Sequence, residues 1–193
     1  MSKAAITEKT LAPWSAKPAG ILDRFYKDHG YFPSLAKGET ETVPEVHGWE
    51  RRQPVAVTLG TVYDEWCLAR IAKQLDKKDE ADYFLNRSLN YHKIFNKETK
   101  FFHPKDLDYR FPPGIGGRDA YDESTGYVYR FDVPHNIADL VNMLGGKELF
   151  VKELEDMYST PLGKGRPDFY HIYADHTGNV GQFGMGNEPA MHI

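Results

Sequence analysis

Cysteine, long apolar runs and clustered basic residues are all scarce in this sequence. Cys67 is the only cysteine among 193 residues, so no disulfide can form within the chain, and the redox compartment stays open. No apolar run approaches the ~20 residues of a membrane span. The first residues, "MSKAAITEKTLAPW", lack the apolar core of a signal peptide. We therefore expect a soluble chain that has no membrane segment and no export signal of its own.

Several function classes are excluded by missing patterns. Lysine and arginine are scattered, and the net charge is -4, so the basic patch of a nucleic-acid-binding protein is absent. The glycines of "PPGIGGRDAY" follow no strand and lack the lysine of a phosphate-binding loop. No nucleophile-elbow sequence supports a serine hydrolase, and no repeat of fixed length indicates a helical-repeat protein.

Aromatic residues, in contrast, are plentiful, at 13% of the chain, with 12 Tyr, 11 Phe and 3 Trp. Such rings can serve as platforms for the faces of sugars, or they can simply fill the core and pack the loops. A length of 193 residues is enough for one domain, or for a piece of a larger one.

Helical periodicity dominates the chain. Apolar residues recur at helical spacing in five segments, and strand-like alternation is scarce. These segments predict helices over 17–30, 54–75, 79–95, 134–146 and 147–158. Between them lie three long segments rich in Pro, Gly, carboxylates and aromatics, at 31–53, 100–130 and 159–193. The pattern predicts an all-α fold of antiparallel helix pairs, with one end built for binding by long loops.

The densest polar stretch is "RDAYDESTGYVYRFDVPHN", which places Asp119, Asp122 and Glu123 next to Tyr127 and Tyr129. A carboxylic acid set against aromatic rings loses hydration, and its pKa rises, as a general acid requires near neutral pH. The alternative is an ordinary solvated acidic loop. In an earlier loop, His47 and Trp49 are candidates to line a pocket or to pack the loop.

The last residues, "HTGNVGQFGMGNEPAMHI", hold amide and carboxylate oxygens among glycines. Asn187 and Glu188 are the main candidates, and oxygen ligands without cysteine suit calcium better than zinc. The alternative is structural: Asn187 would cap a helix whose first turn contains Pro189.

Taken together, these stretches resemble the α-mannosidases of glycoside hydrolase family 92. Three blocks carry the resemblance in order: "GYFPSLAKGETETVPEVHGWERRQPVAVTLGTVYDEWCLARIAKQL", "YDESTGYVYRFDVPHNIADLVNMLGG" and "GMGNEPAMHI". Members of that family have an N-terminal β-sandwich and a C-terminal (α/α)6 barrel. They are calcium-dependent, exo-acting and inverting. The resemblance implies that residues 1–193 are a central part of the barrel, and that the β-sandwich and remaining barrel helices lie outside the chain.

The resemblance also implies roles for single residues. Glu123 falls on the general acid, Tyr127 and Tyr129 on the aromatic positions after it, and Asn187 and Glu188 on the calcium-binding pair. His47 and Trp49 join Tyr127 and Tyr129 as expected substrate-binding residues.

Some positions depart from the family pattern. Ser124 stands for the usual Gly, Tyr127 for the usual Trp, and Gly60 for a Glu, which leaves the sugar and the linkage open. The expected general base lies beyond Ile193.

The resulting hypothesis is a fragment of a periplasmic or secreted enzyme that removes terminal α-linked mannose, with α-1,2 linkage favoured, from a mannose-containing glycan. The fragment alone is expected to be inactive and to self-associate through exposed barrel faces. Two alternatives stay open. One is another α/α-barrel sugar hydrolase that needs no calcium, and the other is a non-catalytic helical module that binds carbohydrate.

Overall fold

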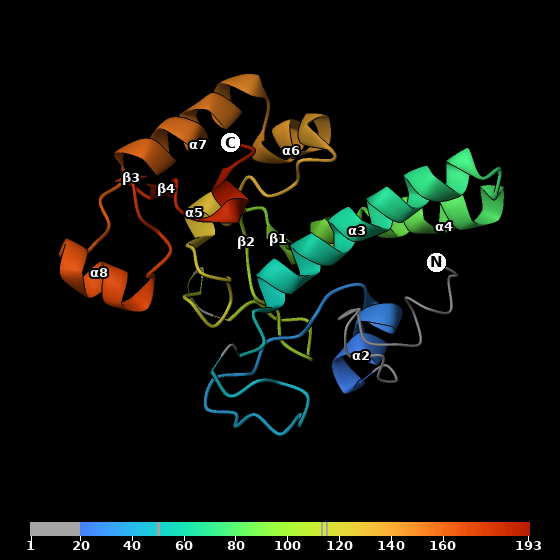
Figure 1. The fold of residues 1–193 in the computed structure, drawn as a ribbon, viewed down its shortest axis with the longest axis horizontal. Coiled ribbons are helices and arrows are strands. Elements are labelled where there is room, and N and C mark those ends of the chain that lie inside the picture. Colours follow the sequence, from blue (N-terminus) through green and yellow to red (C-terminus); the bar gives the residue numbers. More distant parts are fainter. Residues whose placement is uncertain (1–19, 50, 113, 115) are drawn as a thin grey trace.

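The computed structural model describes residues 20–49, 51–112, 114 and 116–193, and its fold is mostly helical (Figure 1). The helices in chain order are α2 (Ile21–His29), α3 (Pro54–Gln74), α4 (Lys78–Arg87), η1 (Asn90–Ile94), α5 (Gly126–Tyr129), α6 (Ile137–Leu144), α7 (Lys147–Ser159), α8 (Arg166–Ile172) and η2 (Glu188–Ala190). Two short antiparallel pairs join β1 (Phe95–Asn96) to β2 (Phe101–Phe102) and β3 (Asn179–Val180) to β4 (Phe183–Gly184).

The helix α3 packs along α4, and together they form a long arm (Figure 1). Pro54 stands in the first turn of α3, where its missing N–H costs no hydrogen bond. Within the arm, Glu65 is 1% exposed and forms an ion pair with Arg87 of α4. The Tyr26 hydroxyl of α2 donates to the same carboxylate over 2.7 Å. A buried carboxylate paired in this way ties α2, α3 and α4 together.

The helix expected over 79–95 is divided in two. The helix α4 ends at Arg87, and the 3-10 helix η1 begins at Asn90. The cause lies at Ser88, whose hydroxyl donates over 2.7 Å to the carbonyl of Leu85, three residues earlier. Such a bond from side chain to backbone competes with the helical ladder, so the chain tightens and turns there.

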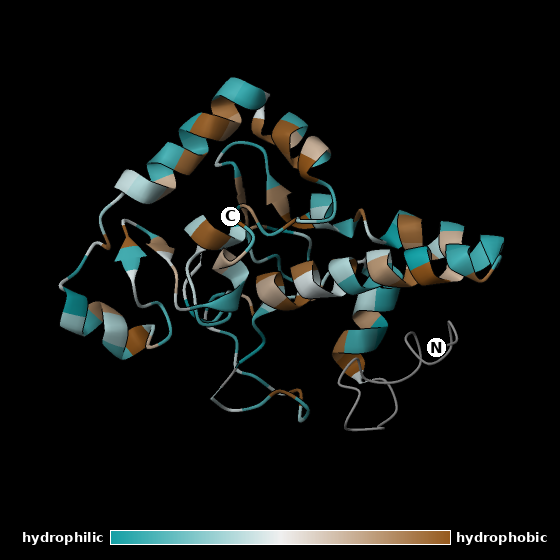
Figure 2. Ribbon diagram, turned by 45° about the horizontal axis from the view of Figure 1, so that its top comes forward, coloured by the Kyte–Doolittle hydropathy of each residue, from teal (hydrophilic) through white to brown (hydrophobic). Residues whose placement is uncertain are grey.

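A second helix pair, α6 and α7, follows the sequence prediction closely. Leu140 and Leu144 of α6 and Met157 of α7 are fully buried. Gly145 ends α6 at φ 106, a left-handed conformation that glycine adopts without strain. Figure 2 shows hydrophobic and hydrophilic residues alternating along α3, α4 and α7, as expected for helices with one buried face.

The segments expected to be long loops contain short elements. Residues 100–130 include β2 and α5, and residues 159–193 include α8, the β3–β4 hairpin and η2. The helix α5 contacts β2, β4 and η2, so the last part of the chain returns to the middle of the molecule. This return places the C-terminal segment beside the segment that carries Glu123.

The (α/α)6 barrel is not seen among the residues that the structure describes. The two helix pairs α3–α4 and α6–α7 diverge from the region around α5 and do not close into a ring (Figure 1). One stripe of α3 is buried, with Val55, Leu59 and Val62 at 0–1% exposure. Other apolar side chains are exposed: Ile71 of α3 is 54% exposed, and Leu75, which directly follows α3, is 62% exposed. Across 20–49, 51–112, 114 and 116–193, every helix is too short or too polar to cross a membrane.

Candidate active site

The segment that carries Glu123 is anchored to the start of α3. The backbone N–H groups of Val55 and Ala56 both donate to the carbonyl of Ala120, over 3.1 and 3.4 Å. The first N–H groups of a helix lack partners within the helix, so this carbonyl acts as the cap. The side chain of Gln53, just before the helix, donates over 2.9 Å to the Asp122 carboxylate. The longest helix of the described chain therefore fixes the residues just before Glu123.

Aromatic and hydroxyl side chains hold the same segment from the other side. The Tyr121 hydroxyl donates to the carbonyl of Phe102 over 2.7 Å, and the Tyr129 hydroxyl donates to the carbonyl of Asp122 over 3.0 Å. Ser124 is fully buried, and its hydroxyl lies 3.2 Å from Nδ1 of His176. The backbone on both sides of Glu123 is thus fixed by hydrogen bonds.

Glu123 itself has an unusual backbone. Its φ is 52°, in the left-handed region that non-glycine residues seldom adopt. Strain of this kind persists only where the surroundings hold the residue in place, and it gathers at functional sites. The anchored neighbours satisfy that condition. The side chain of Glu123 is half-buried.

Charge and burial act together on this carboxylate. Burial raises the pKa of Glu123 above its ordinary value, and nearby carboxylates raise it further. These neighbours are Asp122, Asp175 and Glu188, whereas the Arg118 guanidinium lowers the pKa. A carboxyl whose pKa is raised keeps its proton to higher pH, as a general acid must.

Asn187 meets Glu123 across 64 residues of sequence. Its amide Nδ2 donates to Oε2 of Glu123 over 3.3 Å, and the residue is 1% exposed. Asn187 precedes η2 with Pro189 in the first turn, but its side chain makes no capping hydrogen bond. Its Oδ1 is buried without a hydrogen-bond partner among the described residues. The structural reading, a helix cap, therefore fails for the side chain, which turns to Glu123 instead.

These oxygen donors bear on the expected calcium. No group of three or more His, Cys, Asp or Glu side chains within the described ranges is placed to hold a metal ion. The unpartnered Oδ1 of Asn187 is nevertheless a hard oxygen donor, and a buried oxygen with no partner is costly unless something binds it. Glu188, next in sequence, is exposed and can supply a carboxylate. The chemistry of these two oxygen donors suits calcium, although the described residues do not form a complete metal site.

The two tyrosines after Glu123 lie in different surroundings. Tyr129 is 3% exposed and packs on Tyr121. Its hydroxyl donates to the carbonyl of Asp122. Tyr127 is half-buried, with its ring edge-on to Phe101 at 5.1 Å. The Arg130 guanidinium lies over both of these last rings. Tyr127 is thus the more accessible ring of the two.

His47 and Trp49, the other two expected substrate-binding residues, lie near the segment that precedes Glu123. Trp49 is 71% exposed, and the guanidinium of Arg118 lies 6.0 Å from its ring. His47 helps to line a cavity of about 260 Å³ between the 34–54 and 104–120 segments. Arg118 therefore links the Trp49 loop to the charges around Glu123.

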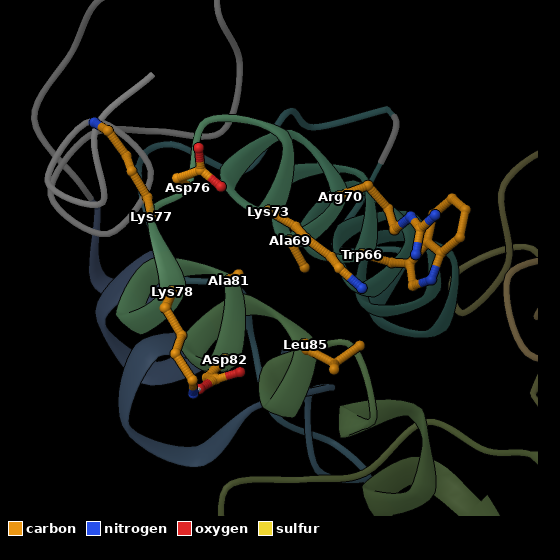
Figure 3. A pocket seen from close by; sticks show the side chains of 10 residues that line it. All are labelled: Trp66, Ala69, Arg70, Lys73, Asp76, Lys77, Lys78, Ala81, Asp82 and Leu85. Atoms are coloured by element: carbon orange, nitrogen blue, oxygen red, sulfur yellow. The ribbon is translucent and has the colours of Figure 1, made fainter.

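A cavity of about 400 Å³ lies elsewhere, between the outer ends of α3 and α4 (Figure 3). Trp66, Arg70 and Lys73 of α3 face Asp82 and Leu85 of α4 across it. None of its lining residues belongs to the Glu123 or Asn187 segments. Trp66 is half-buried and borders this cavity.

Sequence reasoning did not identify three residues of the site region, Gln53, Arg118 and His176. The signals available were weak: Gln53 directly precedes a helix-starting proline, and His176 lies in a glycine-rich stretch. Their roles depend on contacts with distant segments.

Three relatives extend these observations. A secreted glycosidase of Arthroderma benhamiae, itself uncharacterised, is 24% identical over 181 residues, covering 77% of this chain and 22% of the relative. A family GH92 α-mannosidase from Bacteroides thetaiotaomicron was solved in complex with mannoimidazole. It superposes with a TM-score of 0.67 at 28% identity, covering 87% of this chain and 21% of that one. A family 92 inverting mannosidase from the same organism gives a TM-score of 0.67 at 24% identity, covering 94% and 24%, and this match supports the fold alone.

The chain thus spans between 21% and 24% of the length of these relatives. The sequence also matches the glycosyl hydrolase family 92 catalytic domain over residues 1–193. Because this match extends over the whole chain, the chain belongs to glycosyl hydrolase family 92, as part of its catalytic domain.

Proposed function

We propose that this chain is the acid-bearing segment of a longer, calcium-assisted enzyme that removes terminal α-linked mannose from glycans. Residues 1–193 would form part of an (α/α)6 barrel, completed by a β-sandwich and further helices from outside the chain. The observation that carries the proposal is the meeting of Glu123 with Asn187, at 3.3 Å, from segments 64 residues apart. Family membership and the likeness to an α-mannosidase solved with mannoimidazole support it.

Glu123 would protonate the glycosidic oxygen of the leaving group. Its raised pKa, caused first by burial, favours the protonated form that this step needs. In an inverting mechanism a second carboxylate, about 6.5–9.5 Å from the acid, activates water on the other face of the sugar. That base would come from outside the chain. The inverting outcome is what the resemblance to family 92 implies, and it stays a hypothesis for this chain.

Calcium would be held in part by Asn187 Oδ1 and the Glu188 carboxylate. When bound, such an ion holds sugar hydroxyls and stabilises charge that develops on the ring. Asn187 would then serve two groups, with its amide nitrogen on Glu123 and its amide oxygen on the metal. Around this centre, Tyr127, His47 and Trp49 would contact the glycan, and Tyr129 would support the acid through the backbone of Asp122.

The finer details of the proposal are an α-1,2 linkage and an extracellular or periplasmic location. The location is supported by the secreted relative from Arthroderma benhamiae. The linkage stays a hypothesis, because Tyr127 and Gly60 stand where the family pattern usually has other residues.

The test is Glu123→Gln in the full-length protein, which keeps the side-chain shape and removes the proton. We expect a loss in kcat on the order of 10²–10⁴ for a natural mannoside. The loss should be smaller for an aryl α-mannoside with an activated leaving group, because that group needs less protonation. Near wild-type turnover of the natural substrate by this variant would refute the acid assignment.

Calcium is tested separately by chelation. Removing metal from the full-length protein should abolish hydrolysis, and adding calcium, but not zinc, should restore it. Calcium binding followed by calorimetry should weaken in Asn187→Ala. Full activity in a metal-stripped enzyme would favour the calcium-independent sugar hydrolase instead.

A further inference from the structure

His176 joins the two segments that carry the site. The residue is fully buried, between α8 and β3, and its Nδ1 lies 3.2 Å from the hydroxyl of Ser124, which is also fully buried. Ser124 directly follows Glu123 and stands where the family pattern usually has Gly. A glycine there would offer no side chain for this contact, so the Ser–His pair is a feature of this sequence.

The imidazole ring also lies against Gly184 in β4. A Cβ added at Gly184 would stand 2.7 Å from Cγ and Cδ2 of the ring, closer than any real contact. The absent side chain of Gly184 therefore makes the space that the ring fills. Gly184 lies three residues before Asn187, so His176 bonds the segment of Glu123 and packs on the segment of Asn187.

We propose that His176, through Ser124 and Gly184, is a positioning residue that sets the Glu123 carboxylate relative to Asn187. Glu123 is held in a left-handed conformation, at φ 52°, and such a conformation lasts only when both flanks are fixed. Gln53 and Tyr129 fix the flank at Asp122. The side-chain contact that fixes the flank at Ser124 is the one to His176.

The role of His176 is geometric and not one of proton transfer. Burial lowers the pKa of His176, with the backbone of Gln182 opposing that shift in part, and the lowered pKa favours the neutral ring. A neutral imidazole has one donor and one acceptor nitrogen, and a serine hydroxyl can serve either. No hydrogen bond joins His176 to Glu123 among the described residues, so its effect passes through Ser124.

The inference rests on Glu123 being the acid, and the test uses the full-length protein. Ser124→Ala removes the hydroxyl and leaves the ring in place. A small displacement of a catalytic group costs on the order of 10- to 100-fold in rate. We expect kcat for a natural mannoside to fall by about tenfold, with KM changed less than about threefold. We expect a much smaller loss for an activated aryl α-mannoside, because only protonation is impaired.

Gly184→Ala provides a second variant, which perturbs the His176 ring through its contact with β4. Its added methyl group forces the imidazole or β4 to shift, so it should lower the same natural-to-activated ratio of kcat values. The matched control is Thr99→Ala, which removes another hydroxyl–imidazole contact, the 2.7 Å pair of Thr99 and His103. The control should leave the ratio unchanged. Thermal unfolding should confirm that each variant is folded.

Each outcome decides the inference. A selective loss for the natural substrate in Ser124→Ala and Gly184→Ala, and not in Thr99→Ala, supports it. Equal losses for both substrates indicate a merely structural role and overturn it, as does an unchanged ratio. If Glu123→Gln itself shows no selective loss, the acid assignment fails. If Glu123→Gln is selective and Ser124→Ala is not, the positioning role alone fails.

Discussion

The strained backbone of Glu123 predicts that the site lowers the stability of the fold. Glu123 has φ 52°, where a Cβ is unfavourable and glycine is at ease. Replacing Glu123 by Ala removes the carboxylate but keeps the Cβ, whereas replacing it by Gly removes both. The difference between these two variants therefore isolates the strain from the lost hydrogen bond and the lost charge.

The expected size follows from two opposing effects. A left-handed conformation costs an L-residue roughly 1–2 kcal/mol. Glycine loses more entropy on folding, which costs roughly 0.5–1 kcal/mol relative to Ala. The Gly variant should therefore be more stable than the Ala variant by about 0.5–1 kcal/mol. For a domain of this size, that corresponds to a melting temperature about 1–4 °C higher.

Asp119 supplies the matched control four residues earlier. Its side chain is 86% exposed, and its φ is not positive. At this position the order should reverse, so that Asp119→Ala is more stable than Asp119→Gly. The assay is thermal unfolding of all four variants under one buffer condition, in the presence of a chelator. If Ala were the more stable residue at both positions, the left-handed conformation of Glu123 would not exist in solution, and the strain argument would be refuted.

Two further predictions concern pH and association. Burial raises the pKa of Asp132 from 3.8 to about 6, so its charge destabilises the folded state as pH rises. The stability of Asp132→Asn relative to wild type should therefore increase between about pH 4 and pH 6, and unfolding at several pH values measures this; a constant difference would contradict it. The isolated 193-residue chain exposes Ile71 at 54% and Leu75 at 62%, so light scattering should show self-association, reduced by Ile71→Lys and Leu75→Lys together.

The helices were largely predictable from local sequence. The limits of α3 and α7 agree with those expected to within one residue, because a proline, a glycine pair and regular apolar spacing fix them within each segment. The helix expected over 134–146 is shorter, since α6 runs from Ile137 to Leu144. The long helix expected over 79–95 was wrong, since one serine hydroxyl turned toward its own backbone at Ser88. The first residues of the helix predicted over 17–30, at 17–19, lie outside the described residues. Regular apolar spacing and helix-ending residues can be recognised in the sequence, whereas the rotamer of a single serine cannot.

The sequence predicted which residues belong to the candidate site, but it did not predict how they are arranged. The pattern around Glu123 and the Asn-Glu-Pro stretch pointed to these residues from their composition and order. Their contact spans 64 residues, and the support from Gln53 and His176 comes from elements equally distant in sequence. Periodicity has no access to contacts of that range. The left-handed conformation of Glu123 was also unexpected, since sequence rules assign such positions to Gly or Asn.

Two features of the site oppose folding, and they concern the two residues that the sequence pattern marks most clearly. A chain selected for stability alone would favour Gly at position 123, where φ is 52°. It would also turn the side chain of Asn187 to cap η2, yet that amide reaches Glu123 and leaves its buried Oδ1 without a partner in the described structure. Substitutions at these two positions would remove both costs, so a purely structural role does not explain why Glu123 and Asn187 are present. The proposed function accounts for both features together: the strained carboxylate would deliver a proton, and the unpartnered oxygen would bind a ligand.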